Sequence, residues 1–203
     1  MSSSGIEIEA KFLVKDLGRI ETLLHDAGAG QIQDRIYERN LRFDLPDDSL
    51  RAGNRVLRLR RDEHAVLTYQ GPGTVEDGIR VREELEVIVG DFDMAERILT
   101  ALGYHVVLMY EKYRRTYKLG GCLVMLDELP YGHFVEIEAD DADAIFAMTG
   151  RLGLNKEASI CDSYQALFDR VRGALGLGFR DLSFKNFERI DVSPALLGVR
   201  CAD

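Results

Sequence analysis

Hydrophobic and polar residues alternate near the start of the chain, in the run Ile6-Glu7-Ile8-Glu9-Ala10-Lys11-Phe12. Strand side chains point alternately to opposite faces of a sheet, so this spacing places Glu7, Glu9 and Lys11 on one face. The other face is apolar and suited to packing. The pattern predicts a strand over residues 6–14 that is charged on one side and buried on the other.

The same alternation recurs in four later segments. The charged residues that share a face there are Arg58 and Arg60; Arg80, Arg82, Glu84 and Glu86; Lys112 and Arg114; and Glu136 and Glu138. Any one of these sets, taken alone, is equally well explained as a solvated sheet face of mixed charge. Because the pattern recurs in five segments, it favours a sheet that closes on itself with its charges inside, which would create a site for a polyanion and a metal ion.

The remaining periodicity predicts about eight strands and four helices, an α+β arrangement dominated by antiparallel hairpins. The expected strands cover residues 6–14, 31–44, 55–61, 65–70, 79–89, 104–119, 122–127 and 133–139, and the expected helices cover residues 17–27, 91–102, 141–152 and 159–172. Gly120-Gly121 is expected to form a hairpin turn, and Gly71-Pro72-Gly73 is expected to form a turn between strands.

Composition limits the domain organisation and the class of partner. The 203 residues are 46% hydrophobic, which suits one globular domain. We expect this domain over residues 1–172 and a C-terminal extension over residues 173–203, where the sequence becomes rich in glycine. The 35 acidic and 26 basic residues give a formal charge of -9, which repels nucleic acid. The basic pairs must therefore act locally rather than as an open phosphate-binding patch.

Targeting and redox signals are weak. No apolar run approaches the roughly 20 residues that span a bilayer, and the N-terminal residues lack the features of a signal peptide, so we expect a cytoplasmic protein. The three cysteines, Cys122, Cys161 and Cys201, are odd in number and lack CxxC spacing. Neither a disulfide framework nor a zinc site is expected from them.

The energetics of burial favour a functional interpretation of the alternating charges. Burying an unpaired ion costs several kcal/mol, and even paired buried ions often do no better than hydrophobic replacements. A fold that keeps about a dozen ionic groups inside therefore needs a wet interior or a charged ligand.

The two glutamate pairs, Glu7/Glu9 and Glu136/Glu138, come from opposite ends of the strand series. If the strands close in chain order, the first and last strands become neighbours, and these carboxylates converge on one wall suited to a hard divalent cation. The basic pairs would face them and neutralise phosphate oxygens. Asp127 is a further carboxylate that could reach a metal or orient a basic residue.

At this point the chain resembles the CYTH superfamily, which contains class IV adenylyl cyclases and thiamine triphosphatases. The hallmark ExExK motif corresponds to Glu7-Ile8-Glu9-Ala10-Lys11. The further matching motifs, in the same order as in the family, are Leu57-Arg58-Leu59-Arg60, Thr68-Tyr69-Gln70-Gly71-Pro72, Arg82-Glu83-Glu84-Leu85-Glu86, Glu111-Lys112-Tyr113-Arg114, Asp127, Gly132-His133-Phe134-Val135-Glu136-Ile137-Glu138 and Ser163-Tyr164. The resemblance covers about residues 5–170 and is closest to the class IV cyclase branch.

The resemblance implies an eight-stranded antiparallel closed β-barrel, with helices outside, whose tunnel binds a triphosphate and one or two Mg²⁺ or Mn²⁺ ions. The implied metal ligands are Glu7, Glu9, Glu136 and Glu138, with Glu84, Glu86 and Asp127 as further candidates. The implied substrate-binding residues are Lys11, Arg58, Arg60, Gln70, Arg82, Lys112 and Arg114, and the implied catalytic residues are Lys11, Glu9 and Glu136. The family usually has lysine where this chain has Gln70, so one phosphate contact loses its charge; Arg80 is a candidate to compensate.

Three functions fit these residues. The leading hypothesis is hydrolysis of a phosphoanhydride bond in a triphosphate such as ATP, thiamine triphosphate or tripolyphosphate. The alternative is a class IV-type adenylyl cyclase that converts ATP to cyclic AMP and pyrophosphate. A non-catalytic module that binds a nucleotide or polyphosphate is the third. The expected partner is a small molecule rather than nucleic acid or a membrane, and the sequence leaves a homodimer open.

Overall fold

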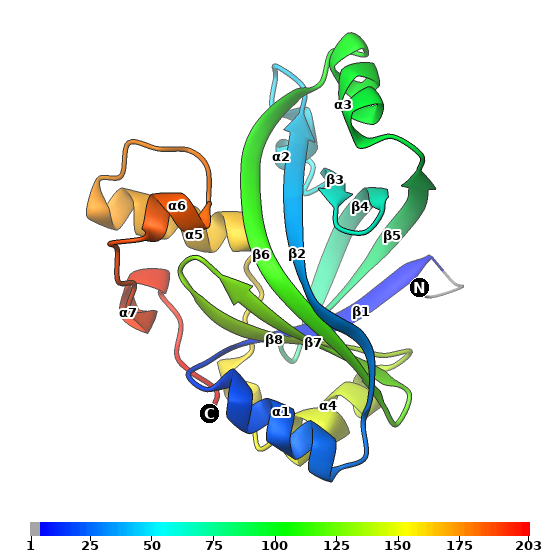
Figure 1. Cartoon of the computed structure of the whole chain (residues 1–203), viewed down its shortest axis with the longest axis vertical. Helices are drawn as coiled ribbons and strands as arrows, with labels where there is room; N and C mark the ends of the chain where they lie inside the picture. Colours follow the sequence, from blue (N-terminus) through cyan, green and yellow to red (C-terminus); the bar gives the residue numbers. More distant parts are fainter. Residues whose placement is uncertain (1–4) are drawn as a thin grey trace.

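Eight antiparallel strands form a ring in the computed structural model, which describes residues 5–203 (Figure 1). The strands are β1 (Ile6–Val14), β2 (Gly30–Asp44), β3 (Val56–Arg61), β4 (Ala65–Glu76), β5 (Ile79–Val89), β6 (His105–Leu119), β7 (Cys122–Leu129) and β8 (Gly132–Glu138). The predicted α+β class, with eight antiparallel strands and helices around them, is confirmed.

The strands follow one another around the ring in the order β1-β5-β4-β3-β2-β6-β7-β8, and β1 pairs with both β5 and β8. The expected pairing of the first and last strands is therefore confirmed. The expectation that the strands close in chain order is wrong for the first half, because β1 pairs with β5 and β2 pairs with β6. Both pairings join strands that are distant in sequence.

Short helices connect the strands and cover the outside of the ring. They are α1 (Leu17–Asp26), α2 (Ser49–Ala52), α3 (Phe92–Ala101), α4 (Ala142–Arg151), the 3-10 helix η1 (Lys156–Ala158), α5 (Tyr164–Leu175), α6 (Phe184–Phe187) and α7 (Pro194–Leu197). The carboxylates of Asp16, Asp91 and Asp141 cap α1, α3 and α4 by accepting backbone N–H groups of the first turn. Within residues 5–203, no helix is long and apolar enough to cross a membrane.

The apolar faces of the strands point outward, and helices cover most of them, although Leu85 and Val87 on β5 are exposed. Helices α1 and α4 contribute Ile20 and Ile145 to a cluster with Phe12 and Ile137 of β1 and β8, and all four side chains are buried. Helix α3 covers β2 and β3 in the same way, at the opposite end of the molecule (Figure 1). The charged faces of the strands are left to the interior of the ring.

Two local predictions are wrong. Gly71-Pro72-Gly73 lies inside β4, where a register shift between Gln70 and Gly73 accommodates a proline that cannot donate to the ladder. The turn comes later, at Asp77 and Gly78, which both have positive φ. The fourth helix begins at Tyr164 rather than Ser159, because the segment before it runs along β1 and the N–H of Ile160 donates to the carbonyl of Lys11.

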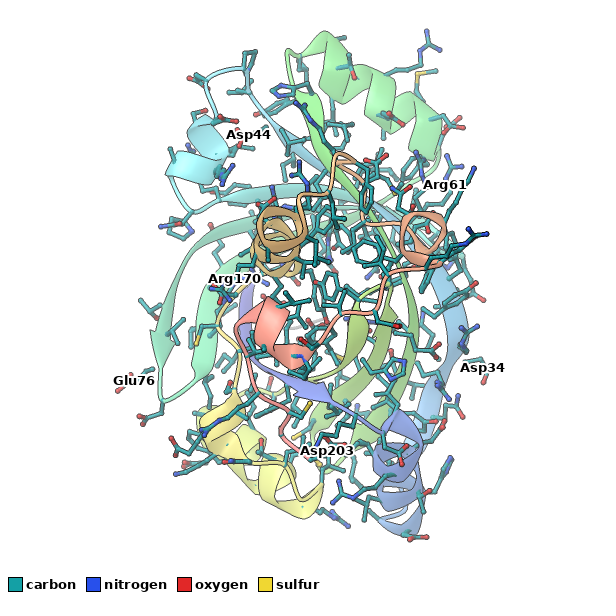
Figure 2. All side chains as sticks on the ribbon, turned by 90° about the vertical axis from the view of Figure 1, so that its left-hand side faces the viewer. Asp34, Asp44, Arg61, Glu76, Arg170 and Asp203 are labelled. Atoms are coloured by element: carbon teal, nitrogen blue, oxygen red, sulfur yellow. The ribbon has the colours of Figure 1, made fainter. Side chains whose placement is uncertain are left out.

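The last thirty residues pack on α5 and on the end of the ring that α5 covers (Figure 2). Leu182 is fully buried and pairs with β6, since its N–H donates to the carbonyl of Met109 and its carbonyl accepts the N–H of Glu111. Near the C-terminus, the N–H of Ala202 donates to the carbonyl of Leu13. Helix α5 continues to Leu175, past the boundary expected after Arg172.

We expect Leu182→Ala to lower the free energy of unfolding by about 2–5 kcal/mol, the range for truncating a buried leucine. The physical reason is that Leu182 belongs to the same apolar cluster as α5. Urea denaturation followed by circular dichroism measures the change. A loss below about 0.5 kcal/mol, within the usual range for surface substitutions, would mean that the extension folds independently of residues 1–172.

Candidate functional site

The interior of the ring is a cavity of about 730 Å³ with a strongly charged lining. The predicted site residues that line this cavity are Glu7, Glu9, Lys11, Arg58, Arg60, Gln70, Arg82, Glu84, Glu86, Lys112, Arg114, Glu136 and Glu138. A second hollow of about 420 Å³ adjoins it and shares seven of its lining residues, including Arg60 and Glu138. The prediction that the alternating charges face a common interior is confirmed.

Acidic side chains gather on the three neighbouring strands β8, β1 and β5. Glu9 lies directly opposite Glu138 in the β1–β8 register, Glu7 is close enough to influence both, and Glu84 influences Glu138. Burial raises the pKa of Glu138 to about 7, and the charges of Glu7 and Glu84 add to this. Burial also raises the pKa values of Glu7 and Glu9. This wall therefore holds more negative charge than its own cations neutralise.

Arg82 partly neutralises the acidic wall. Its guanidinium donates to Glu7 and lies 3.2 Å from a carboxylate oxygen of Glu9. Within residues 5–203, no three acidic, histidine or cysteine side chains are gathered closely enough to form a ready metal site. The donor set nevertheless fits a hard divalent cation chemically, because it consists of carboxylates that raise one another's pKa. Glu7, Glu9 and Glu138 are the residues that would hold such an ion.

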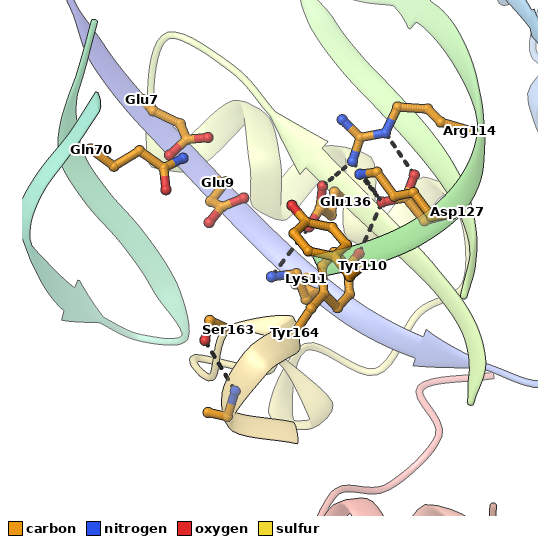
Figure 3. A network of polar contacts seen from close by, with 12 residues as sticks. Glu7, Glu9, Lys11, Gln70, Tyr110, Arg114, Asp127, Glu136, Ser163 and Tyr164 are labelled. Carbon is orange, nitrogen blue, oxygen red and sulfur yellow. Dashed lines mark hydrogen bonds and ion pairs between the residues drawn. The ribbon is translucent and has the colours of Figure 1, made fainter. Parts of the chain in front are cut away.

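A tight ionic network connects β6, β7 and β8 on the next part of the ring (Figure 3). Asp127 accepts from Arg114 at 2.6 Å and from Lys112 at 3.0 Å, and Glu136 pairs with Arg114 and, at 3.2 Å, with Lys11. Burial acts to raise the pKa of Glu136, but Lys11 and Arg114 outweigh it and hold this pKa well below its usual value. Glu136 is therefore ionised and already paired.

Asp127 differs from the other predicted metal ligands. It is fully buried, is not part of the cavity lining, and also accepts from the Tyr164 hydroxyl at 2.9 Å. Its oxygens are taken up by Lys112, Arg114 and Tyr164. Of the two roles expected for Asp127, the geometry supports orientation of the basic residues rather than metal binding.

The two basic residues of β3 differ in their partners. Arg58 lies 3.6 Å from Glu86 and donates to the Tyr110 hydroxyl at 3.4 Å, whereas Arg60 lies 3.0 Å from Asp62 and 3.9 Å from Glu38. The long ion pair of Arg58 leaves its guanidinium group available to another anion.

Gln70 also lines this part of the cavity, where its amide donates to Glu84 at 2.6 Å. It holds one carboxylate of the acidic wall and adds no positive charge.

Sequence reasoning missed three residues at the cavity. Glu38 is a fully buried carboxylate between Arg60 and Lys112, and these cations outweigh burial to lower its pKa to about 2. Tyr164 lies with its ring 4.3 Å from the Lys11 ammonium. Arg42, on β2, also lines the cavity. Glu38, Asn40 and Arg42 alternate along β2 and therefore point to the same face of the strand. This pattern could have identified Glu38 and Arg42 from the sequence.

A ring of strands that encloses a charged cavity, acidic on one side and basic on the other, defines a class of proteins built to hold a polyanion. Comparison with known sequences makes the assignment specific: residues 5–149 match the CYTH domain family, and the chain belongs to this family. A Methanocaldococcus jannaschii protein named "Putative adenylate cyclase" is 29% identical over 140 residues, which cover 68% of this chain and 79% of the relative.

Solved structures share the fold. A Vibrio parahaemolyticus protein named "putative adenylate cyclase" superimposes with a TM-score of 0.72 at 21% identity, covering 81% of this chain and 98% of the other. A Pyrococcus horikoshii protein gives 0.67 at 25% identity, with coverages of 78% and 96%. A Hippeastrum "putative adenylyl cyclase", described with a dominant triphosphatase activity, gives 0.61 at 17% identity, with coverages of 80% and 95%.

Proposed function

We propose that this chain is a divalent-metal-dependent enzyme that hydrolyses a phosphoanhydride bond of a triphosphate held inside the ring. The observation that carries the proposal is the division of the cavity. Carboxylates stand on β8, β1 and β5, and burial raises the pKa values of Glu7, Glu9 and Glu138 among them, while cations stand on β3 and β6. A triphosphate with a bound divalent cation presents charges of both signs and matches this division.

The basic residues account for binding of the triphosphate. Arg58, Arg60, Lys112 and Arg114 supply donors that neutralise phosphate oxygens in the ground state and the charge that shifts to the leaving phosphate. Asp127, which lies behind the cavity lining and accepts from the Tyr164 hydroxyl, holds Lys112 and Arg114 in place.

The acidic residues account for the metal. Glu7, Glu9 and Glu138 would hold Mg²⁺ or Mn²⁺, with Glu84 and Glu86 nearby. When bound there, such an ion would supply charge neutralisation at the phosphate and a lowered pKa for a bound water. Lys11 and Glu136 form a paired unit beside this wall, where the Lys11 ammonium can donate to a phosphate oxygen. The chain's own residues thus bind the substrate, orient it and balance its charge.

We favour hydrolysis over cyclisation because hydrolysis requires only that the site hold the triphosphate and a water molecule. The charged residues of the cavity can do both. The Hippeastrum relative, described with a dominant triphosphatase activity, supports the same order. Cyclisation of ATP is the second candidate and is favoured by the cyclase names of the Methanocaldococcus and Vibrio relatives.

Product analysis tests the proposal. The purified chain is incubated separately with tripolyphosphate, thiamine triphosphate and ATP, each with Mg²⁺ or Mn²⁺, and with EDTA as the control. We expect release of phosphate in the presence of metal and none with EDTA. Cyclic AMP and pyrophosphate from ATP would instead establish the cyclase, and tight binding without any product would establish a binding module.

A further inference from the structure

Arg42 is a cation inside the cavity that has no acidic partner in the part of the chain that the structure describes. It lies on β2 directly opposite Arg58 on β3, and both line the same cavity. Two neighbouring guanidinium groups repel each other unless an anion lies near them. Arg58 has such a neighbour, because Glu86 lies 3.6 Å away.

Ten cations line this cavity, and most of them are paired within the protein. Those with a carboxylate within 4.0 Å are Lys11, Arg58, Arg60, Arg82, Lys112 and Arg114. The other four are Arg42, Arg51, Arg55 and Arg80. Arg51 is exposed and Arg55 donates to the carbonyl of Ser49 at 3.0 Å, so neither is an unpaired cation enclosed by protein.

The acid nearest to Arg42 in sequence is already in use. Asp44 lies two residues further along β2, and its carboxylate accepts the N–H groups of Leu45, Leu50 and Arg51 at 2.8–2.9 Å. It holds the loop before α2 and the first turn of that helix. Among residues 5–203, no carboxylate forms an ion pair with Arg42 within 4.0 Å, and Asp44 acts on its charge only from a distance.

The surroundings of Arg42 are unfavourable to its charge. Burial lowers the pKa of Arg42, and although Tyr110 and Asp44 act in the opposite direction, the charges of Arg58 and Arg82 lower it further. Taking a cation out of water without a partner costs several kcal/mol. Arg80, at the start of β5, also forms no ion pair within 4.0 Å. It lies directly opposite Glu9 in the β1–β5 register, however, and is therefore next to the acidic wall.

We propose that Arg42 is an additional substrate-binding residue that pairs with an oxyanion of a phosphate chain, together with the adjacent Arg58. This inference rests on the proposed function, because it assigns a ligand to the same cavity. The planar guanidinium forks of two arginines match the oxygens of one phosphate group. The neutral Gln70 on β4 adds no charge to the cavity, and Arg42 supplies a cation from β2, on the other side of β3.

The test compares Arg42→Met with Arg39→Met. Arg39 lies on the same strand but on the outer face, where its guanidinium lies 5.8 Å from the Phe92 ring, so its replacement is a charge-matched control. The probe is the imido analogue of tripolyphosphate, in which nitrogen replaces the bridging oxygens and blocks hydrolysis. Its affinity is measured by calorimetry with Mg²⁺ present, and circular dichroism verifies that each variant is folded.

We expect Arg42→Met to weaken binding about 10- to 100-fold, the range for loss of a hydrogen bond to a charged group. Arg39→Met should change the affinity less than about twofold, which corresponds to about 0.4 kcal/mol. Arg42→Gln carries the same expectation as Arg42→Met and serves if the methionine variant does not fold.

Unchanged affinity in a folded Arg42 variant, with tight binding by the wild type, would overturn this inference and leave the proposed function standing. Absence of binding by the wild type would overturn both.

Discussion

Replacement of Glu9 by glutamine is expected to reduce metal-dependent turnover at least about a hundredfold while the protein stays folded. The side chain is buried on the acidic wall, and burial together with the charge of Glu7 raises its pKa. Glutamine has the same size but no charge, so a divalent cation loses one of its anionic donors. Loss of groups that only orient a metal ligand typically costs 10–100-fold, and loss of a ligand should cost more. Phosphate release from tripolyphosphate, measured against Mg²⁺ concentration, gives the result.

The matched control is Glu83→Gln. Glu83 lies on β5, beside Glu84 of the acidic wall, but its side chain is exposed on the outer face of the ring. The Glu83→Gln substitution removes the same charge from the protein without changing the cavity, so turnover should be unchanged. Full activity of Glu9→Gln at low Mg²⁺ would refute the assignment of Glu9 as a metal ligand. Equal losses in both variants would point to a general charge effect.

The charged interior of the fold could be predicted from sequence because strand side chains alternate strictly. In β1, Glu7, Glu9 and Lys11 line the cavity while Ala10 and Phe12 pack under helices, as the spacing requires. This information is local: it needs only the period of two and the identity of each residue.

The order of strands around the ring could not be predicted in the same way. The pairing of β1 with β5 depends on contacts between residues far apart in sequence, and no periodic pattern within either strand specifies its partner. The recurring alternation favoured a closed sheet with a charged interior, and the resemblance to a family implied an eight-stranded barrel, but neither specified the order of the strands.

Arg42 was missed because the regular alternation on β2 is short. Glu38, Asn40 and Arg42 alternate, but register shifts interrupt the strand before them, between Gln31 and Gln33 and between Gln33 and Ile36. The strand also carries basic residues on both faces. The role of Asp127 was ambiguous for another reason. Its partners Lys112 and Tyr164 come from β6 and α5, so its burial behind the cavity lining depends on tertiary packing.

Replacement of Asp127 by asparagine is expected to lower the free energy of unfolding by about 3–5 kcal/mol, the range for removing one partner of a buried ion pair. Asp127 is fully buried and neutralises both Lys112 and Arg114. Asparagine keeps the size and one acceptor oxygen but removes the charge. The remaining acids, Glu38 at 3.5 Å from Lys112 and Glu136 beside Arg114, compensate only in part. Urea denaturation of variant and wild type measures the loss.

Glu128→Gln is the control that separates the effect of burial on stability from the effect of losing a negative charge. Glu128 is the next residue on β7, points to the outside of the ring and also pairs with two arginines, Arg35 at 2.8 Å and Arg115 at 3.0 Å. Solvent screens these pairs, so their loss should cost about 1 kcal/mol or less. If both variants lost the same stability, burial would not be the reason for the importance of Asp127, and its assigned role in holding Lys112 and Arg114 would fail. A large loss in Asp127→Asn alone would show that the ring's stability depends on the carboxylate that also positions Lys112 and Arg114, the cations proposed to bind phosphate.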